Sequence, residues 1–258
     1  MIHENTQKDT KSQEDFSLSP KERYTLAYAY FLNSTKMERS TRPRVKICCI
    51  LSLEEAWLAI EHGASAIGLV SEMPSGPGVI AEELIAEIAA TLPPAVGSFL
   101  LTCKQDTDEI IDQQRRLRVN TLQLCDRLQT GGHRDLRRAL PGISLVQVIH
   151  VNGSEAVAEA VSVAPDVDGI LLDSGNQSLP VKELGGTGRV HDWGLSRKIR
   201  DAVNVPVFLA GGLSADNVGS AIRQVEPFGV DVCSGVRTEG KLDEAKLRSF
   251  LESATAPN

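Results

Sequence analysis

Two thiols stand side by side in the stretch VKICCI, residues 45–50, at the end of a run that otherwise has the composition of a buried strand. Successive side chains of a strand point to opposite faces, so Lys46 and Cys48 share one face and Cys49 takes the other. A lysine turned toward apolar covering helices would be costly, whereas one on the other face can meet a carboxylate. We therefore expect Cys48 to point inward as the working thiol and Cys49 to point outward as a small apolar side chain.

Two carboxylates occupy similar strand positions further along the chain. Asp173 ends the run DGILLDS and follows apolar residues, where a carboxylate is costly unless it has a partner or a role. Asp173 is therefore a candidate acid, with a capping or loop aspartate as the alternative. Asp231 lies between two valines, and the alternation turns it inward. We expect Asp231 to pair with Lys46 and to serve structure.

Three glycine-containing turns, GGTG (185–188), AGGL (210–213) and CSGV (233–236), follow the late apolar runs. Glycines let backbone N–H groups approach an anion closely, and such turns form anion-binding nests. We expect these turns to bind a phosphate group. The candidate phosphate-binding residues are Gly186, Gly188, Gly211, Gly212, Ser234 and Gly235.

The spacing of apolar runs predicts the elements that position these groups. From Val45 onward, short apolar runs alternate with amphipathic segments that have helical periodicity, eight of each, and SLEE (52–55) fits a helix-capping box. This pattern predicts a closed (β/α)8 barrel over residues 44–258, whose active site lies at the carboxyl ends of the strands. A doubly wound open sheet is the alternative, but it places its glycine-rich turn after the first strand. The expected strands cover residues 45–50, 65–70, 95–102, 120–125, 144–151, 168–174, 206–211 and 229–235.

The first 43 residues lack this rhythm and contain all three tyrosines, Tyr24, Tyr28 and Tyr30. The segment SPKERYTLAYAYFL begins with an N-cap pattern and predicts one short helix. We interpret residues 1–43 as an extension, partly helical or disordered, that packs loosely on the barrel. The alternatives are a docking element for a partner or second subunit, and a natural start at Met37.

Charge and composition narrow the function classes. A net charge of −7 argues against a nucleic-acid binder, which needs a basic face. Five cysteines without CxxC spacing argue against a zinc site and a disulfide framework, and favour a reducing, cytoplasmic compartment. No apolar run approaches the roughly 18 residues that a membrane helix needs, and the amino terminus is not typical of a signal peptide. We expect a monomer or homodimer with a small phosphorylated substrate.

A thiol and a carboxyl group across one barrel mouth, with a phosphate anchor, suit paired base and acid catalysis. No metal cluster, nucleotide-binding loop or cofactor lysine is recognisable, so we expect neither metal nor cofactor. The residues by themselves predict an isomerase or related lyase that acts on a sugar phosphate.

The same segments resemble the phosphoribosylanthranilate isomerase family of tryptophan biosynthesis. VKICCI is similar to its first-strand motif, and DGILLDS, GGTGRVHDW, PVFLAGGLSADNV and GVDVCSGV are similar to later motifs in the same order, so that the resemblance covers residues 44–252. It implies the Amadori rearrangement of N-(5-phosphoribosyl)anthranilate to 1-(2-carboxyphenylamino)-1-deoxyribulose 5-phosphate. By this resemblance, Cys48 is the base for the C2 proton, Asp173 is the acid that opens the furanose ring, and the late glycine loops bind phosphate.

The chain also departs from the family pattern. Pro77 stands where the family has an arginine for the anthranilate carboxylate, and Cys125 stands where a histidine ends the fourth strand. Few side chains replace a bidentate arginine. Arg237 or Arg189 is the expected source of the missing charge. A relative that acts on another phosphosugar adduct, and a phosphometabolite-binding protein without catalysis, are the alternatives.

Overall fold

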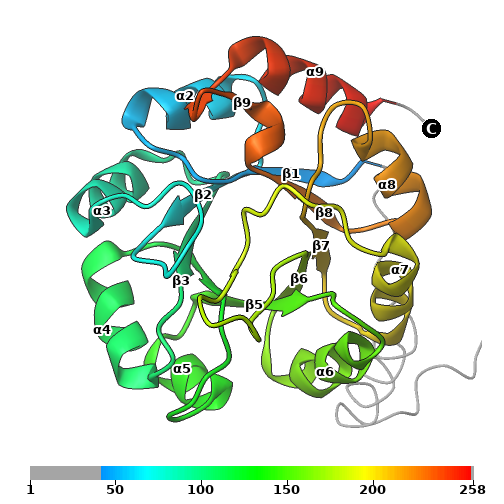
Figure 1. Ribbon diagram of the computed structural model, residues 1–258. Coiled ribbons are helices and arrows are strands. Elements are labelled where there is room, and N and C mark those ends of the chain that lie inside the picture. Colours follow the sequence, from blue (N-terminus) through cyan, green and yellow to red (C-terminus); the bar gives the residue numbers. More distant parts are fainter. Residues whose placement is uncertain (1–41, 257–258) are drawn as a thin grey trace, which may run out of the picture. The chain divides into compact units, whose positions relative to one another are not determined.

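The computed structural model describes residues 42–256, which form a closed barrel of eight parallel strands in chain order (Figure 1). The barrel closes because β8 pairs with β1, with Val232 opposite Ile47. The closed sheet confirms the expected (β/α)8 class and excludes the open sheet. The strands are β1 (Arg44–Ile47), β2 (Ala66–Val70), β3 (Gly97–Thr102), β4 (Thr121–Leu124), β5 (Ser144–His150), β6 (Gly169–Asp173), β7 (Val207–Leu209) and β8 (Gly229–Val232).

The helices that follow the strands lie around the outside of the barrel (Figure 1). They are α2 (Leu53–Glu61), α3 (Glu82–Thr91), α4 (Thr107–Leu117), α5 (His133–Ala139), α6 (Glu155–Val163), α7 (Trp193–Ala202), α8 (Val218–Val225) and α9 (Glu244–Thr255). A 3-10 turn, η1 (Ala164–Asp166), extends α6, and after β8 come a second 3-10 turn, η2 (Ser234–Val236), and a hairpin of β9 (Arg237–Thr238) and β10 (Lys241–Leu242). No pattern in the sequence had predicted this hairpin.

The cap of α2 differs from the expected capping box. Ser52 accepts a hydrogen bond from the Glu55 backbone N–H at 3.3 Å, as a capping serine should. The Glu55 carboxylate instead accepts from the Leu51 N–H at 3.0 Å and from the guanidinium of Arg237. The same segment therefore caps a helix and ties it to the β9–β10 hairpin.

Two apolar layers follow from the alternation along the strands. Ile47, Ile170 and Leu172 belong to the layer between barrel and helices. Phe99, Phe208 and their neighbours fill the barrel interior, where the two rings meet edge to face at 5.9 Å. Inward residues of adjacent strands thus share one packed interior, with the polar groups at its carboxyl end.

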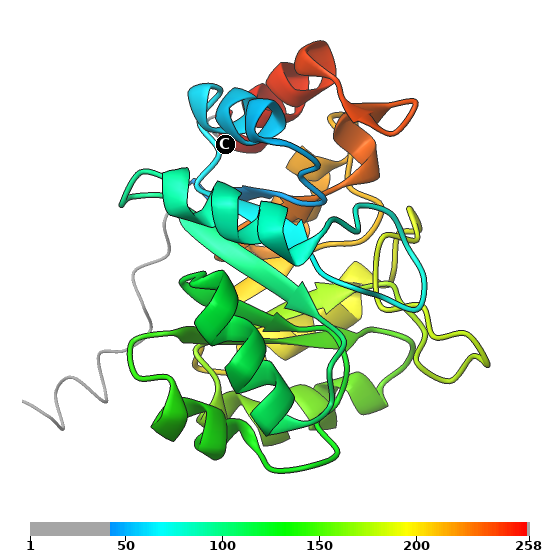
Figure 2. The same cartoon turned by 90° about the vertical axis from the view of Figure 1, so that its left-hand side faces the viewer.

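Two loops extend from the carboxyl end of the barrel, residues 71–81 after β2 and residues 174–192 after β6 (Figure 2). They meet, because the Ser75 hydroxyl donates to the Lys182 carbonyl oxygen at 2.7 Å. A side chain on Gly186 would begin 2.7 Å from Cδ of Pro77. The two loops therefore narrow the mouth of the barrel from opposite sides.

Three expectations lie outside these elements. The helix around Tyr24 to Tyr30, the loose tail and the start at Met37 fall outside the described residues and stay predictions. Over residues 42–256, no helix combines the length and the apolar character needed to cross a membrane.

Candidate active site

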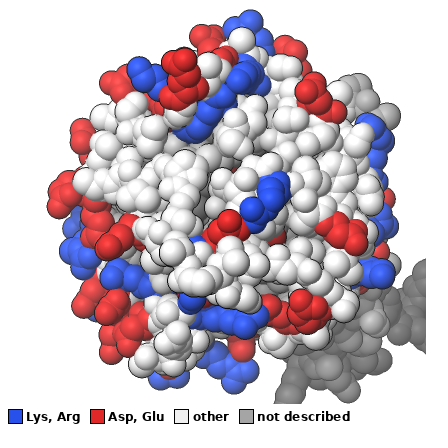
Figure 3. All heavy atoms as spheres, in the orientation of Figure 1, with Lys and Arg blue, Asp and Glu red and all other residues white. Residues whose placement is uncertain are grey.

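A cavity opens at the carboxyl end of the barrel, beneath the two loops. In Figure 3 the surface near the centre of this face is mostly uncharged, and most charged groups stand around its rim. Of the residues singled out in the sequence, those that line the cavity are Cys48, Cys49, Pro77, Cys125, Asp173, Gly186, Gly188, Gly211, Gly212, Asp231 and Ser234. Residues distant in sequence therefore share one space.

Cys48 follows the last residue of β1 and is buried at the base of this cavity. Its backbone N–H donates to the Val232 carbonyl oxygen at 2.8 Å, which fixes the start of the loop. Gly68 leaves room for the thiol, since a Cβ there would lie 2.9 Å from Cys48 Sγ and 3.0 Å from Lys46 Nζ. The Lys46 ammonium therefore lies beside the Cys48 thiol.

Cys49 does not point outward, so that expectation is wrong. β1 ends at Ile47, and Cys49 has a φ of 62°, in the left-handed region that turns its side chain back into the cavity wall. There Cys49 joins Cys48 and Cys233 in the lining of the cavity. Strand alternation assigns faces only while the strand continues, and here it stops two residues earlier.

Asp173 is the last residue of β6 and is buried in the cavity wall. Burial raises the pKa of its carboxyl group above the ordinary 3.8, although the Ser174 N–H donates to Oδ1 at 2.7 Å. A raised pKa favours the protonated form, which a proton donor requires. The hydroxyl groups of Ser174 and Thr187 lie 2.6 Å apart and tie this strand end to the 174–192 loop.

The three glycine turns converge on the side of the cavity nearest β7 and β8. Gly211 and Gly212 have φ values of 83° and 62°, a conformation that favours glycine. A Cβ on Gly212 would begin 2.6 Å from the Arg189 carbonyl carbon, so backbone packs directly on backbone. A Cβ on Gly188 would lie 3.7 Å from Ser234 Oγ. Gly235 packs against the Leu213 carbonyl group and does not line the cavity itself.

Arg237 is engaged elsewhere. Its guanidinium donates to both carboxylate oxygens of Glu55, at 3.1 and 3.0 Å, and to the Cys49 and Gly240 carbonyl oxygens. Its side chain is 7% exposed and does not line the cavity. The expectation that Arg237 meets a substrate carboxylate has no support in this arrangement, because both of its Nη atoms bind groups of the protein and its Nε is buried away from the cavity.

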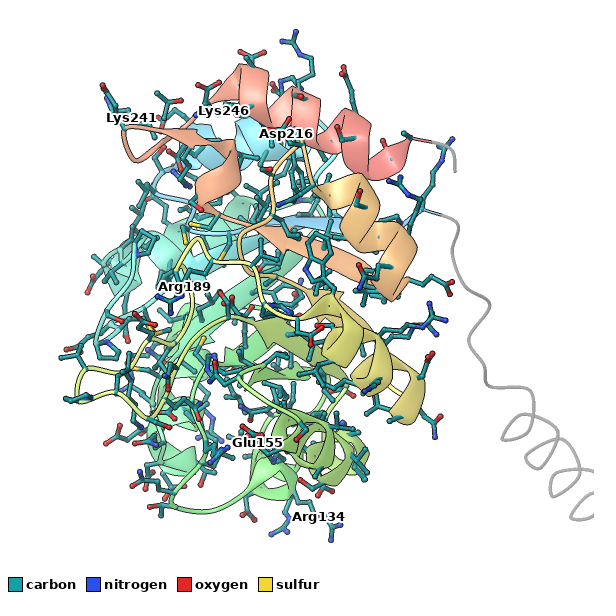
Figure 4. All side chains as sticks on the ribbon, turned by 45° about the vertical axis from the view of Figure 1, so that its right-hand side comes forward. Arg134, Glu155, Arg189, Asp216, Lys241 and Lys246 are labelled. Atoms are coloured by element: carbon teal, nitrogen blue, oxygen red, sulfur yellow. The ribbon has the colours of Figure 1, made fainter. Side chains whose placement is uncertain are left out.

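Arg189 has a more open position. Figure 4 shows it on the 174–192 loop, on the same side of the barrel as Lys241 of the β9–β10 hairpin. It pairs with Glu183, and its side chain is 58% exposed. It follows Gly188, which lines the cavity, but Arg189 itself does not. An exposed ion pair can exchange partners at little cost.

The sequence analysis did not single out His150 or Gln123 as site residues. His150 ends β5 directly opposite Asp173 of β6, and both side chains face the interior. Its Nε2 lies 3.2 Å from the Cys125 carbonyl oxygen, which can only accept, so Nε2 carries the proton. Its Nδ1 is buried with no hydrogen-bond partner among the described residues. Gln123 lines the cavity. Each is a polar residue at an inward strand position, and this pattern in the sequence could have identified both as site residues.

Within residues 42–256, no group of three or more histidine, cysteine, aspartate or glutamate side chains is placed to hold a metal ion. The site instead combines a thiol, a buried carboxyl group and a glycine-lined backbone nest. Together with the closed barrel, these define a (β/α)8-barrel protein equipped to transfer protons on a small anionic molecule. A family model described as N-(5'phosphoribosyl)anthranilate (PRA) isomerase matches residues 45–253. The chain belongs to the phosphoribosylanthranilate isomerase family.

Relatives and solved structures agree with this assignment. The N-(5'-phosphoribosyl)anthranilate isomerase of Methanocella arvoryzae is 35% identical over 210 residues, covering 81% of this chain and 96% of that protein. Its counterpart in Haloferax volcanii is 36% identical over 213 residues, covering 82% and 92%. The crystal structure of the Thermotoga maritima phosphoribosyl anthranilate isomerase superposes with a TM-score of 0.69 at 31% identity, covering 82% and 98%. The similarity thus spans the whole barrel.

Proposed function

We propose that this protein catalyses the Amadori rearrangement of N-(5-phosphoribosyl)anthranilate in tryptophan biosynthesis. The observation that carries the proposal is the meeting of Cys48, Asp173 and the glycine turns in one cavity. The family assignment supports it, as does a solved relative in complex with reduced 1-(o-carboxyphenylamino)-1-deoxyribulose 5-phosphate, at 30% identity and a TM-score of 0.67.

In the proposed mechanism, backbone N–H groups of the turns at Gly211, Gly212 and Ser234, together with the 185–188 turn, hold the substrate phosphate. The protonated Asp173 carboxyl group donates its proton to the furanose ring oxygen. The ring opens, and a C1–N iminium forms. The Cys48 thiolate then removes the C2 proton, which gives an enolamine that tautomerises to the ketone product. The iminium makes the C2 proton acidic, so the acid step prepares the base step.

The remaining groups serve this geometry. Lys46 pairs with Asp231 at 2.9 Å beneath Cys48 and holds the interior polar layer together. Asp231 Oδ1 is buried with no hydrogen-bond partner among the described residues. For the carboxylate of the anthranilate ring we propose Arg189, which can leave Glu183, rather than Arg237, which is held by Glu55 and three carbonyl groups.

A second candidate function follows from the β2 loop. Pro77 occupies the family's arginine position and packs against Gly186, which leaves no bidentate donor at that place. This favours, as the alternative, isomerisation of a phosphosugar adduct that has no aromatic carboxylate. A cytoplasmic location and a monomer or homodimer complete the proposal; a Thermotoga maritima relative is described as dimeric.

Turnover of the anthranilate adduct tests the proposal. Phosphoribosylanthranilate is generated in situ, and the loss of its fluorescence is followed with the wild-type protein, Cys48→Ala and Cys103→Ala. Cys103 is a matched control, because its thiol lies outside the cavity and donates to the Glu72 carbonyl oxygen. We expect loss of signal with wild type and Cys103→Ala only. Folded wild-type protein that binds ribulose 5-phosphate but leaves the fluorescence unchanged would favour the alternative substrate.

A further inference from the structure

Three thiols gather on the β1–β8 side of the cavity: Cys48, Cys49 and Cys233. β1 and β8 are neighbours, and the loops that follow them start together, since the Cys48 N–H donates to the Val232 carbonyl oxygen. Cys233 is the next residue after Val232. The left-handed backbone of Cys49 returns its side chain toward this point instead of the helix layer. The proposed mechanism uses only Cys48.

The surroundings of Cys49 and Cys233 shift the pKa values of their thiols in opposite directions. The interaction with the Cys49 thiol lowers the pKa of Cys233, and the nearby Arg237 guanidinium acts in the same direction. The same interaction raises the pKa of Cys49. Both thiols line the cavity, but Cys233 is partly exposed whereas Cys49 is buried. A reachable thiol with a lowered pKa beside a buried thiol with a raised pKa suits a redox pair, in which one sulfur attacks and the other resolves.

The backbone around the pair is held in place. Arg237 donates to the Cys49 carbonyl oxygen while its other bonds go to Glu55 and Gly240. Cys49 also packs against Gly78, where a side chain would collide with its Cβ. The Cys49 sulfur therefore has little freedom to move away from its partner.

We propose that Cys233 and Cys49 are a peroxide-sensitive pair that forms a reversible disulfide and thereby switches off the adjacent site. The cross-link itself does not depend on the proposed function, whereas the loss of activity rests on it.

The chemistry balances with a peroxide as the oxidant. The Cys233 thiolate attacks one oxygen of hydrogen peroxide, the O–O bond breaks, and the products are Cys233 sulfenic acid and, after protonation, one water. The Cys49 sulfur then attacks the sulfenic sulfur, the S–O bond breaks, and the second water leaves. Two thiols are oxidised by two electrons and one peroxide is reduced. A dithiol reverses the cross-link by exchange.

The position of the pair explains why a cross-link would inhibit. Cys49 directly follows the proposed base Cys48, and Cys233 directly precedes Ser234 of the phosphate nest. Bonding draws the two sulfurs to about 2.0 Å from each other, which shifts both loop starts together. The base and the phosphate would then lose their mutual spacing, on which proton transfer depends.

Peptide mapping by mass spectrometry tests the cross-link directly. The full-length protein is treated with hydrogen peroxide, unreacted thiols are blocked, and the peptides are analysed before and after dithiothreitol. We expect a Cys49–Cys233 peptide pair in wild type, in Cys48→Ala and in the control Cys103→Ala, and none in Cys49→Ser or Cys233→Ser. A bridge that involves Cys48, or only sulfinic and sulfonic acids, overturns the proposal.

Activity is measured on the same samples, each relative to its own untreated value. Wild type and Cys103→Ala should lose most of their turnover and recover it with dithiothreitol. In Cys49→Ser, sulfenic acid at Cys233 has no resolving partner, so excess peroxide should oxidise it further to sulfinic acid, and dithiothreitol should not reverse the loss. A cross-link without loss of turnover would overturn the switch. If wild type has no isomerase activity, the mapping still decides whether the pair forms, so failure of the two proposals can be told apart.

Discussion

Lys46 and Asp231 form an ion pair that is enclosed inside the barrel, with 2.9 Å between Nζ and Oδ2 and side-chain exposures of 1% and 7%. The Lys46 ammonium also lies 5.3 Å from the centroid of the Phe99 ring. Asp231 and nearby groups raise the pKa of Lys46 despite the cost of burial, so the lysine stays charged. A buried charge that loses its partner is expensive, and this pair should dominate the response of the barrel to mutation.

Removing one member of this pair should destabilise the fold strongly. We expect Asp231→Ala to lower the free energy of unfolding by about 3–5 kcal/mol, because Lys46 is left buried and unpaired. The double variant Lys46→Met/Asp231→Leu should be more stable than Asp231→Ala. Urea denaturation followed by circular dichroism measures both. Arg134→Ala, which removes an exposed ion pair with Asp166, is the control and should change little. Equal effects of Asp231→Ala and Arg134→Ala would contradict the prediction.

The proposed acid and base should be separable from folding. Asp173→Asn keeps the shape of the carboxyl group but cannot supply its proton, and we expect kcat to fall by about 100- to 10,000-fold. The kcat of Cys48→Ala should fall at least as far. The melting temperature of both variants should stay close to that of wild type. Steady-state kinetics and calorimetry measure these effects. Wild-type kcat in either variant would remove that residue from the mechanism.

The pH dependence should reveal the acid. Asp173 must hold a proton to donate it, and burial raises the pKa of this group above 3.8. The active form therefore persists below the raised pKa, and kcat/KM should fall as the pH rises through it. Infrared difference spectra across the same range should show a protonated carboxyl band that Asp173→Asn lacks. A band that has already titrated at the pH of an ordinary aspartate would contradict the assignment.

The two arginine candidates should give different phenotypes. Arg189 is exposed and pairs only with Glu183 among the described residues, so Arg189→Ala should raise KM by about tenfold with little change in stability. Arg189→Lys should restore part of this loss. The matched control is Arg134→Ala, which removes another exposed, ion-paired arginine that does not line the cavity. An unchanged KM in Arg189→Ala would mean that another group binds the carboxylate.

Arg237, by contrast, should behave as a structural residue. Its two bonds to Glu55 join the start of α2 to the β9–β10 hairpin, and both side chains are largely buried. We expect Arg237→Met to lower the free energy of unfolding by about 3 kcal/mol, since Glu55 loses its cation. Thermal unfolding measures this. A fully stable Arg237→Met variant with a raised KM would contradict this prediction and indicate that Arg237 binds the substrate.

The alternation of apolar and polar residues along the sequence was sufficient to predict the architecture and much of the site. Alternating apolar runs and amphipathic segments predicted the eight strands, because a strand covered on both faces must be apolar along its length. The same alternation turned Lys46 and Asp231 toward the interior, where the structure pairs them. Asp173 and the glycine turns could be assigned to the carboxyl end of the barrel from their places after the strands, since that end carries the site in this fold.

Tertiary structure decided what happens where the strands stop. Cys49 was expected outside, but β1 ends at Ile47, and the left-handed turn that reverses the Cys49 side chain depends on Gly78, Arg237 and Cys233 from other segments. Arg237 and Arg189 look alike in the sequence, and only the position of Glu55 separates a buried structural arginine from an exposed one. Periodicity is a property of neighbours along the chain and therefore predicts faces, whereas the partner of a charged group is chosen by segments that meet only in the folded barrel.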